Sequence, residues 1–263
     1  MISAVKEPPR IAILIVSCDK YSDLWDTCAL AFNKFWPDCP YDKFLVSNEK
    51  VHEKAFFRSI LVGKDKTWSY GLNVALESLR NQYDYVFTMV EDYFFFEKVD
   101  SAYVSRMFDS FIASDGNFLS LFKLPSRLSR YNEYFGELEN NIPYRHSCGF
   151  TLWKVSTLID LLDVNENAWE FEIYGVRRSF NYSGFFASWK YYRTMNLVVK
   201  GRLVPSEYRR LKKCLPGIEI KRSRISYFEE LKNTITTKLV FAFLRYIPKV
   251  IKNKIYFYKN RVK

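Results

Sequence analysis

The fold of this 263-residue chain is decided by residues 85–92, which read YVFTMVED. Six mostly apolar residues lead without a break into two acids, Glu91 and Asp92. A continuous apolar run of this length is typical of a strand that is buried on both faces, as in a parallel sheet. Ligands of such sheets bind beyond the carboxyl ends of the strands. The stretch therefore predicts a buried strand that ends with two carboxylates at a ligand site.

The start of the chain repeats this pattern. Ile11–Val16 (IAILIV) predicts a second buried strand, which ends at Ser17, Cys18 and Asp19. Between the two strands we expect, in order, a helix over 21–35, short strands over 44–47 and 59–62, and a helix over 70–79. Strands that alternate with helices indicate an α/β fold in which helices flank a mostly parallel central sheet. We therefore expect the polar residues that follow the two strands to meet at one edge of the sheet.

The chain beyond residue 92 continues the alternation. The expected elements are a helix over 100–113, strands over 118–122 and 146–153, a helix over 155–162 and a helix that begins at 168–172. Residues 127–143 are polar and aromatic without a clear period, and they predict a loop or a mobile lid.

The net charge of +11 is distributed unevenly. Residues 201–263 carry 17 Lys or Arg and 4 Asp or Glu, a net +13, which leaves 23 basic and 25 acidic residues, a net −2, for 1–200. This asymmetry predicts a catalytic domain over 1–200 and a basic tail over 201–263 that meets an anionic partner. From residue 227 the tail has a helical apolar stripe, formed by Phe228, Leu231, Ile235, Leu239, Phe243 and Tyr246. A second basic and apolar piece covers 250–258.

Cysteine, histidine and hydropathy patterns exclude several classes of protein. Five cysteines without a Cys-x-x-Cys pair argue against a disulfide framework and a zinc ribbon. The histidines, His52 and His146, lie far apart in the sequence, and we expect structural roles for both. The polar N-terminus lacks a signal-peptide stretch, and no apolar window reaches about 18 residues, which predicts a cytoplasmic protein. No nucleic-acid-binding module is visible, so no nucleic-acid partner is expected.

Three segments together resemble the family-2-like glycosyltransferases of GT-A fold, of the type that builds bacterial surface polysaccharides. The first strand ends at Cys18-Asp19. Residues 68–92 join an Asn-bearing helix to the strand that ends in two acids, and residues 169–172 (WEFE) form a late acidic pair that opens a helix. In that family the corresponding segments bind the nucleotide, the donor diphosphate and the acceptor. The resemblance covers roughly residues 10–195 and leaves the basic tail out.

The resemblance implies a nucleotide-sugar donor, and the chemistry of such a donor agrees with the acidic pair. Departure of a nucleoside diphosphate leaves charge that a hard cation, Mn²⁺ or Mg²⁺, stabilises through carboxylate ligands. Adjacent side chains of a strand point to opposite faces, so we expect one acid to bind metal directly. We assign Asp92 to the metal, and Glu91 to a ribose hydroxyl or a metal-bound water. The pair departs from the family's Asp-x-Asp and has one suitably spaced carboxylate fewer.

Four further residues are expected to bind the donor, namely Ser17, Asp19, Asp65 and Asn73. Asp19 would accept hydrogen bonds from the base or ribose, and its alternative role is a cap or turn residue. Asp65 and Asn73 flank the segment that begins at Trp68; the alternative for Asp65 is an exposed loop acid. Residues 48–49 are further candidates for the same pocket.

Transfer to an acceptor hydroxyl with inversion needs one general base. The resemblance favours Glu172, the second acid of the late pair, with Glu170 as the other candidate. Residues two apart on a helix diverge by about 200°, so only one of them faces the site. The alternative is that both acids complement the helix dipole. Trp169 is expected to stack on a sugar ring, although core packing is the commoner use of a tryptophan.

The expected partners are a nucleotide-sugar donor, a carbohydrate or lipid-linked acceptor and, through the tail, the inner face of an anionic membrane. The tail helix has the alternative of packing on the catalytic domain with a solvated basic face. Two other functions stay open. The first is a non-catalytic nucleotide-sugar or carbohydrate binding protein of the same fold. The second is a basic membrane or nucleic-acid adaptor whose activity lies in residues 201–263.

Overall fold

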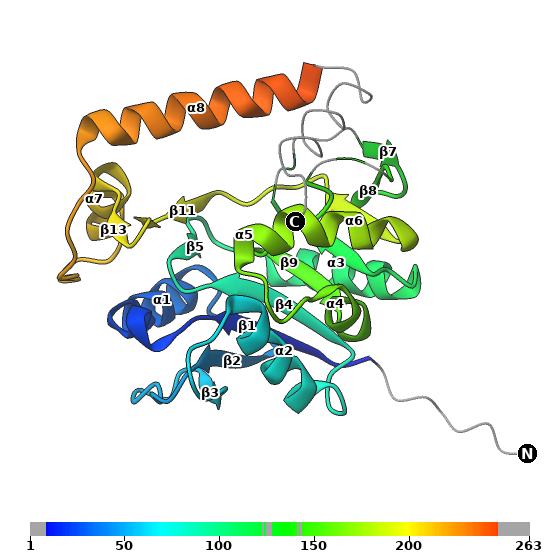
Figure 1. Ribbon diagram of the computed structural model, residues 1–263, viewed down its shortest axis with the longest axis horizontal. Helices are drawn as coiled ribbons and strands as arrows, with labels where there is room; N and C mark the ends of the chain where they lie inside the picture. Colours follow the sequence, from blue (N-terminus) through cyan, green and yellow to red (C-terminus); the bar gives the residue numbers. More distant parts are fainter. Residues whose placement is uncertain (1–8, 123, 125–127, 141, 143, 247–263) are drawn as a thin grey trace, which may run out of the picture.

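The computed structural model describes residues 9–122, 124, 128–140, 142 and 144–246. Within these residues the largest sheet has nine strands (Figure 1). Their spatial order is β3 (Arg58–Leu61), β2 (Asp42–Ser47), β1 (Ile11–Val16), β4 (Tyr85–Val90), β9 (Thr151–Lys154), β6 (Phe118–Ser120), β10 (Phe185–Ser188), β8 (Phe135–Leu138) and β7 (Leu128–Arg130). Only β9 and β8 run against the other seven. The expected α/β fold with a mostly parallel sheet is confirmed.

The register of the parallel strands positions the site. Strand β1 lies between β2 and β4, and Val16 is paired with both Val46 and Val90. The last residues of three strands therefore lie side by side, and the residues that follow them emerge at one edge of the sheet.

Helices cover both faces of the sheet because the strand residues alternate between two hydrophobic clusters. Ile13 and Ile15 pack with α1 (Ser22–Phe35) and α3 (Ser101–Ala113). Ala12 and Leu14 pack with α2 (Trp68–Leu79) and α4 (Val155–Leu161). The small elements are η1 (Asp19–Tyr21), β5 (Tyr93–Phe95), α5 (Ala168–Glu170), η2 (Phe171–Gly175), α6 (Val176–Arg178), η3 (Ser179–Asn181), β11 (Thr194–Asn196), β12 (Val198–Val199) and β13 (Arg202–Leu203).

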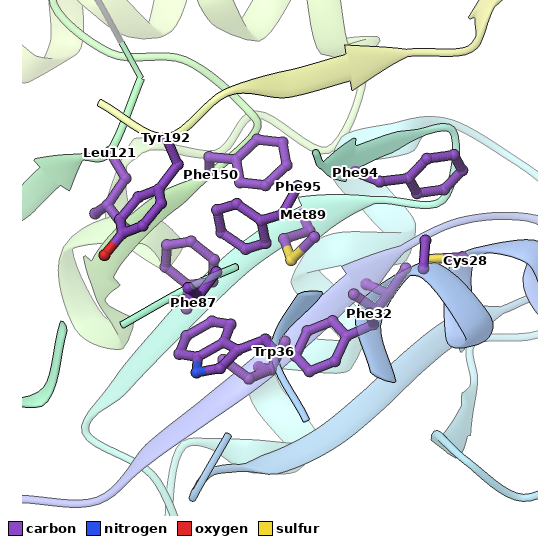
Figure 2. Packing of buried hydrophobic residues seen from close by; sticks show 14 of the residues in the cluster. Cys28, Phe32, Trp36, Phe87, Met89, Phe94, Phe95, Leu121, Phe150 and Tyr192 are labelled. Carbon is purple, nitrogen blue, oxygen red and sulfur yellow. The ribbon is translucent and has the colours of Figure 1, made fainter. Parts of the chain in front are cut away.

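Aromatic rings fill much of the first cluster (Figure 2). Phe95 lies 4.6 Å from Phe150, 5.6 Å from Tyr192 and 5.7 Å from Trp36 between ring centroids, each in an edge-to-face arrangement. Edge-to-face pairs at such distances add to the stabilisation that comes from burial alone. Many of the chain's aromatic residues therefore belong to the core.

Several predicted elements need correction. The segment 127–143 is not a loop throughout, since it contains β7 and β8, which extend the sheet beyond β10. Residues 127, 141 and 143 lie outside the described residues. The strand predicted over 146–153 is β9, which begins only at Thr151, and the strand predicted over 118–122 ends at Ser120. Helix α7 (Pro205–Cys214) was not predicted. The piece over 250–258 lies outside the described residues.

The first part of the basic tail packs on the sheet domain. Leu203, Tyr208, Leu211, Ile218 and Ile220 are buried in the same cluster as Ile13. The boundary at residue 200 stays a prediction, but this packing favours one near residue 226. Helix α8 (Tyr227–Tyr246) comes next in the chain. None of the helices in the described residues is both long and apolar enough to cross a membrane.

Candidate functional site

A cavity of about 390 Å³ lies at the edge of the sheet where β1, β2 and β4 end. Val16, Val46 and Val90 form its floor, and the acidic pair at 91–92 lies beside them. The start of α2 and the start of α5 line the remaining sides. Of the predicted site residues, the cavity brings together Ser17, Asn48, Asp65, Glu91, Asp92 and Trp169, whereas Glu49 is not among its described lining residues.

The acidic pair is the electrostatic centre of this cavity. Glu91 is only 6% exposed. Burial, and then the charge of Asp92, raise the pKa of Glu91, while a hydrogen bond with Ser17 and the charge of Arg222 act in the opposite direction. Burial also raises the pKa of Asp92. Two adjacent carboxylates that are removed from water in this way form a site where a cation is favoured.

The strand end at β1 contributes a hydroxyl and a ring. The Ser17 hydroxyl accepts a hydrogen bond from the Trp25 indole at 2.8 Å, which fixes its position beside Glu91. Tyr21 also lines the cavity, and the guanidinium of Arg222 lies 4.3 Å from the centre of its ring. Arg222 also binds both carboxylate oxygens of Asp23. A side chain of the basic tail therefore holds one wall of the cavity.

The N-terminus of α2 opens into the cavity. The Thr67 hydroxyl accepts the backbone N–H of Tyr70 as an N-cap, and Thr67 lines the cavity together with Asp65. Asp65 accepts a hydrogen bond from Lys20 at 2.8 Å, in an exposed ion pair. The Ser69 N–H donates to the Glu166 carbonyl oxygen at 3.2 Å, so two of the first three N–H groups of α2 already have partners. What this helix N-terminus offers an anion such as a phosphate is therefore mainly the positive end of its dipole. Asn73, further along α2, is not among the described residues that line the cavity.

Asp19 is engaged with the backbone. Its carboxylate oxygens accept hydrogen bonds from the N–H groups of residues 48, 49 and 50, at 3.0–3.2 Å. The Asn48 side chain in turn accepts the N–H of Asp19. Asp19 therefore fixes the loop that follows β2 against η1, and it does not line the cavity. Its geometry is that of the turn residue that the sequence left open as an alternative.

The late acidic segment begins at the cavity and then turns away from it. Trp169 lines the cavity and is 79% exposed, so its ring is available to a ligand. Asn167 and Glu170 form a capping box, in which the Glu170 carboxylate accepts the Asn167 N–H at 2.9 Å. Glu170 is therefore committed to the start of the helix.

Glu172 lies on η2, a π-helical turn of a kind that is frequent at functional sites. One carboxylate oxygen accepts the N–H of Cys148 at 2.8 Å. Burial raises the pKa of Glu172, which makes the carboxylate a better proton acceptor. Glu172 is not among the described residues that line the cavity.

The residues of the cavity suit a divalent cation that keeps some of its waters. Glu91 and Asp92 supply two carboxylates whose pKa values are raised because burial outweighs the Ser17 hydrogen bond to Glu91 and the charge of Arg222. The described residues contain no cluster of three or more His, Cys, Asp or Glu arranged for a metal ion. Mg²⁺ commonly binds through one or two carboxylates and completes its shell with waters and substrate phosphates. A cation would therefore be held by this pair together with a phosphate-bearing ligand.

Sequence patterns miss two functional residues of the cavity. Tyr21 reads as the start of the apolar face of α1, although it follows a strand end by only five residues. Arg222 belongs to the basic tail, and no local signal shows that it returns to the first helix. Trp68 lines the cavity too, but it also packs on Phe171, 5.7 Å away between ring centroids.

No protein-family model matches the sequence. No curated protein matches it either. Solved structures do match the fold. S. aureus TarS 1–349 in complex with UDP-GlcNAc is similar, with 12% identity and a TM-score of 0.50, over 97% of this chain and 76% of that one. UDP-glucose pyrophosphorylase from Acinetobacter baumannii is similar with 10% identity and a TM-score of 0.50, over 88% of this chain and all of that one.

These similarities concern the fold. They show that the chain has the GT-A-like α/β architecture found in nucleotide-sugar enzymes. At 10–12% identity they assign no residue and no substrate.

Proposed function

We propose that this chain is a glycosyltransferase that moves a sugar from a nucleotide-sugar donor to a carbohydrate hydroxyl. One observation carries the proposal: a buried acidic pair follows β4 inside a cavity that also contains a helix N-terminus and an exposed tryptophan. The helix terminus and a cation suit a diphosphate, and the tryptophan suits the apolar face of a sugar. The fold is the one found in nucleotide-sugar enzymes.

In the proposed reaction each part of the cavity has one role. Asp92 and Glu91 would both hold Mn²⁺ or Mg²⁺, since both line the cavity, whereas the sequence alone assigned Glu91 to a ribose hydroxyl or a metal-bound water. The bound cation would neutralise charge on the departing nucleoside diphosphate. Tyr21 and Ser17 line the nucleotide side, and Trp169 orients the sugar. Glu172, which follows Trp169 by about one helical turn and lies outside the described lining of the cavity, takes the proton of the attacking hydroxyl, because Glu170 is committed to its cap. One base on the far side of the sugar gives inversion at the anomeric carbon.

The acceptor is proposed to be a growing surface polysaccharide (O-antigen, capsule or lipopolysaccharide) on a carbohydrate or lipid-linked carrier at the inner face of the membrane. The first donors to test are UDP-sugars, because the similar TarS structure holds UDP-GlcNAc.

Thermal-shift titration and nucleotide release test the proposal together. Wild type is titrated with UDP-, GDP-, CMP- and dTDP-sugars, with and without Mn²⁺. We expect one nucleotide class to raise the melting temperature in a cation-dependent way, since saturation at 100 times the dissociation constant adds about 2.7 kcal/mol. Asp92→Asn should lose this shift, whereas Asp38→Asn, at an exposed position, should keep it.

The outcomes separate the competing functions. Release of nucleoside diphosphate on addition of a carbohydrate acceptor supports transfer. A shift without release from any donor and acceptor would instead favour a nucleotide-sugar binding protein. No shift with any nucleotide sugar would refute the proposed donor site.

A further inference from the structure

The C-terminal helix α8 carries an apolar stripe that the other described residues leave exposed. Its members follow one another at spacings of three and four residues, on one face of the helix. The exposed fractions are 78% for Phe228, 58% for Leu231, 49% for Ile235, 64% for Leu239 and 39% for Phe243. The alternative in which this stripe packs on the catalytic domain is therefore not what the structure contains.

The opposite face of α8 is the one that meets the body. Glu230 accepts a hydrogen bond from the Ser206 hydroxyl, and Arg202 pairs with Glu229, so the first turn is fixed. Further along, Asn233 and Thr237 line a cavity of about 410 Å³ between α8 and the strands β5 and β11. At 100° per residue the stripe and this polar face lie about 200° apart around the helix axis.

This orientation is unusual in energetic terms. A surface helix ordinarily turns its apolar face to the core and its polar face to water. Here the helix does the reverse, and α8 forms the outer margin of the molecule in Figure 1. An exposed apolar stripe of this kind marks an interaction surface.

The charge pattern of the chain identifies what the stripe meets. Residues 227–263 contain nine Lys or Arg and two acids, and both acids, Glu229 and Glu230, are engaged with the body. After residue 246 the sequence adds six basic residues and no acid, interspersed with apolar ones. Apolar side chains beside lysines are the composition that binds an anionic bilayer surface.

We propose that the outward face of α8 lies in the interface of an anionic membrane, and that the basic residues that follow 246 in the sequence add to its attraction for anionic headgroups. The helix then lies along the membrane surface, and its polar face holds the catalytic body against the bilayer. This inference rests on α8 and its charges, and it is independent of the proposed transferase activity.

Vesicle flotation of the full chain tests the proposal. Wild type should float with phosphatidylcholine vesicles that contain phosphatidylglycerol, and should float poorly with phosphatidylcholine alone or in high salt. For the double variant Ile235→Glu/Leu239→Glu, the partition coefficient onto the anionic vesicles should fall about ten-fold or more. Lys249→Gln/Lys252→Gln/Lys254→Gln should lower binding further, by about 100-fold, because each lysine near an anionic surface contributes about five-fold.

The control is Leu30→Glu, which adds one such negative charge on α1, at a leucine that is 50% exposed and so comparable with Ile235 at 49%. It should float as wild type does, and unchanged melting temperatures should show that all variants are folded. Partition that is insensitive to the α8 substitutions, or equal on neutral and anionic vesicles, would overturn the proposal. So would a wild-type dimer in solution that the α8 double variant converts to a monomer, because a second copy would then cover the stripe.

Discussion

At the scale of single residues, His146 makes the stability of the fold depend on pH. Its ring centroid lies 4.7 Å from that of Phe171 and 5.4 Å from that of Trp153. Burial lowers the pKa of His146 from 6.5 to about 3. Between these two pH values the unfolded chain binds the proton and the folded chain does not. Stability is therefore lost as the pH falls below about 6.5, by about 2–3 kcal/mol at about pH 4.5.

Urea unfolding at neutral and acidic pH measures this contribution. The variant His146→Phe, which keeps an aromatic ring in the site, should lose less stability on acidification than wild type does. His52→Gln is the control, since it changes the other histidine and should leave the contribution of His146 in place. Equal pH dependence in wild type and His146→Phe would contradict the prediction.

The two acids of the late pair give a second prediction at this scale. Glu172→Gln should lower kcat about 100-fold or more, because it removes the proposed base while keeping a group that can accept the Cys148 N–H. Glu170→Gln has the same chemistry two residues earlier, at a capping box. It should change stability by less than about 1 kcal/mol and leave kcat within a few-fold. Steady-state kinetics with the identified donor decide between them, and the reverse order would move the base to Glu170.

At the scale of elements, Arg222 joins the segment after α7 to the first helix. Its guanidinium binds Asp23 at 2.6 and 2.7 Å and the Lys20 carbonyl at 3.0 Å. The side chain of Arg222 is only 12% exposed, whereas that of Asp23 is 41% exposed. We expect Arg222→Ala to lower the free energy of unfolding by about 1–2 kcal/mol. A double-mutant cycle with Asp23→Ala should show a coupling energy of about 1 kcal/mol between the two side chains.

The nearby Lys20–Asp65 pair is the matched comparison for Arg222. Both of its side chains are well exposed, at 78% and 45%, so its coupling should be weaker than that between Arg222 and Asp23. Because Arg222 stacks on Tyr21, Arg222→Ala should also weaken donor binding more than Lys20→Ala does. Chemical denaturation measures the two coupling energies, and donor titration measures the affinity for the donor. Equal coupling energies in the Arg222–Asp23 and Lys20–Asp65 cycles would contradict the predicted difference between the two ion pairs.

The elements that were predictable are those with a continuous local signal. The apolar runs at 11–16 and 85–90 are strands with the same bounds, and the acids of the second run reach the cavity. Strand β7 has one apolar residue in three and depends on its pairing with β8, which no local pattern carries. Helix α7 is strongly basic, its buried face consists of only Pro205, Tyr208 and Leu211, and its Pro205 suggests a break, although proline at the first helical position is a start signal.

The site was predictable where its residues follow strand ends directly, or, for Asp65 and Trp169, where the family resemblance pointed to them. Ser17, Glu91 and Asp92 belong to the first group. Tyr21 and Arg222 could not be predicted, because their approach depends on how the segment near residue 222 packs on η1 and α1. The hydrogen bonds of Asp19 to the loop after β2 also depend on tertiary structure.

At the scale of the whole molecule, the shared core predicts where the chain can be cut. A chain that ends at residue 200 loses Leu203, Tyr208 and Leu211, all of which are buried with the first cluster. This shortened chain should no longer unfold in a single cooperative thermal transition. A chain that ends at residue 226 keeps these residues and lacks only residues 227–263, so it should unfold cooperatively within a few degrees of the full chain. Circular dichroism melts distinguish the two, and a stable 1–200 fragment would support the boundary at 200.

The central place of β9 has a consequence for synthesis of the chain. Strand β4 is complete at residue 90, but its neighbour β9, which covers the second edge of β4, begins only at residue 151. At 5–20 residues per second a ribosome takes about 3–12 s to make the stretch between them. During that interval the nascent chain holds a half-sheet with an open, apolar strand edge, which is a template for pairing with other chains. Yield in cells should therefore depend on translation rate and on chaperones that cover strand edges, more than on the stability of the finished fold.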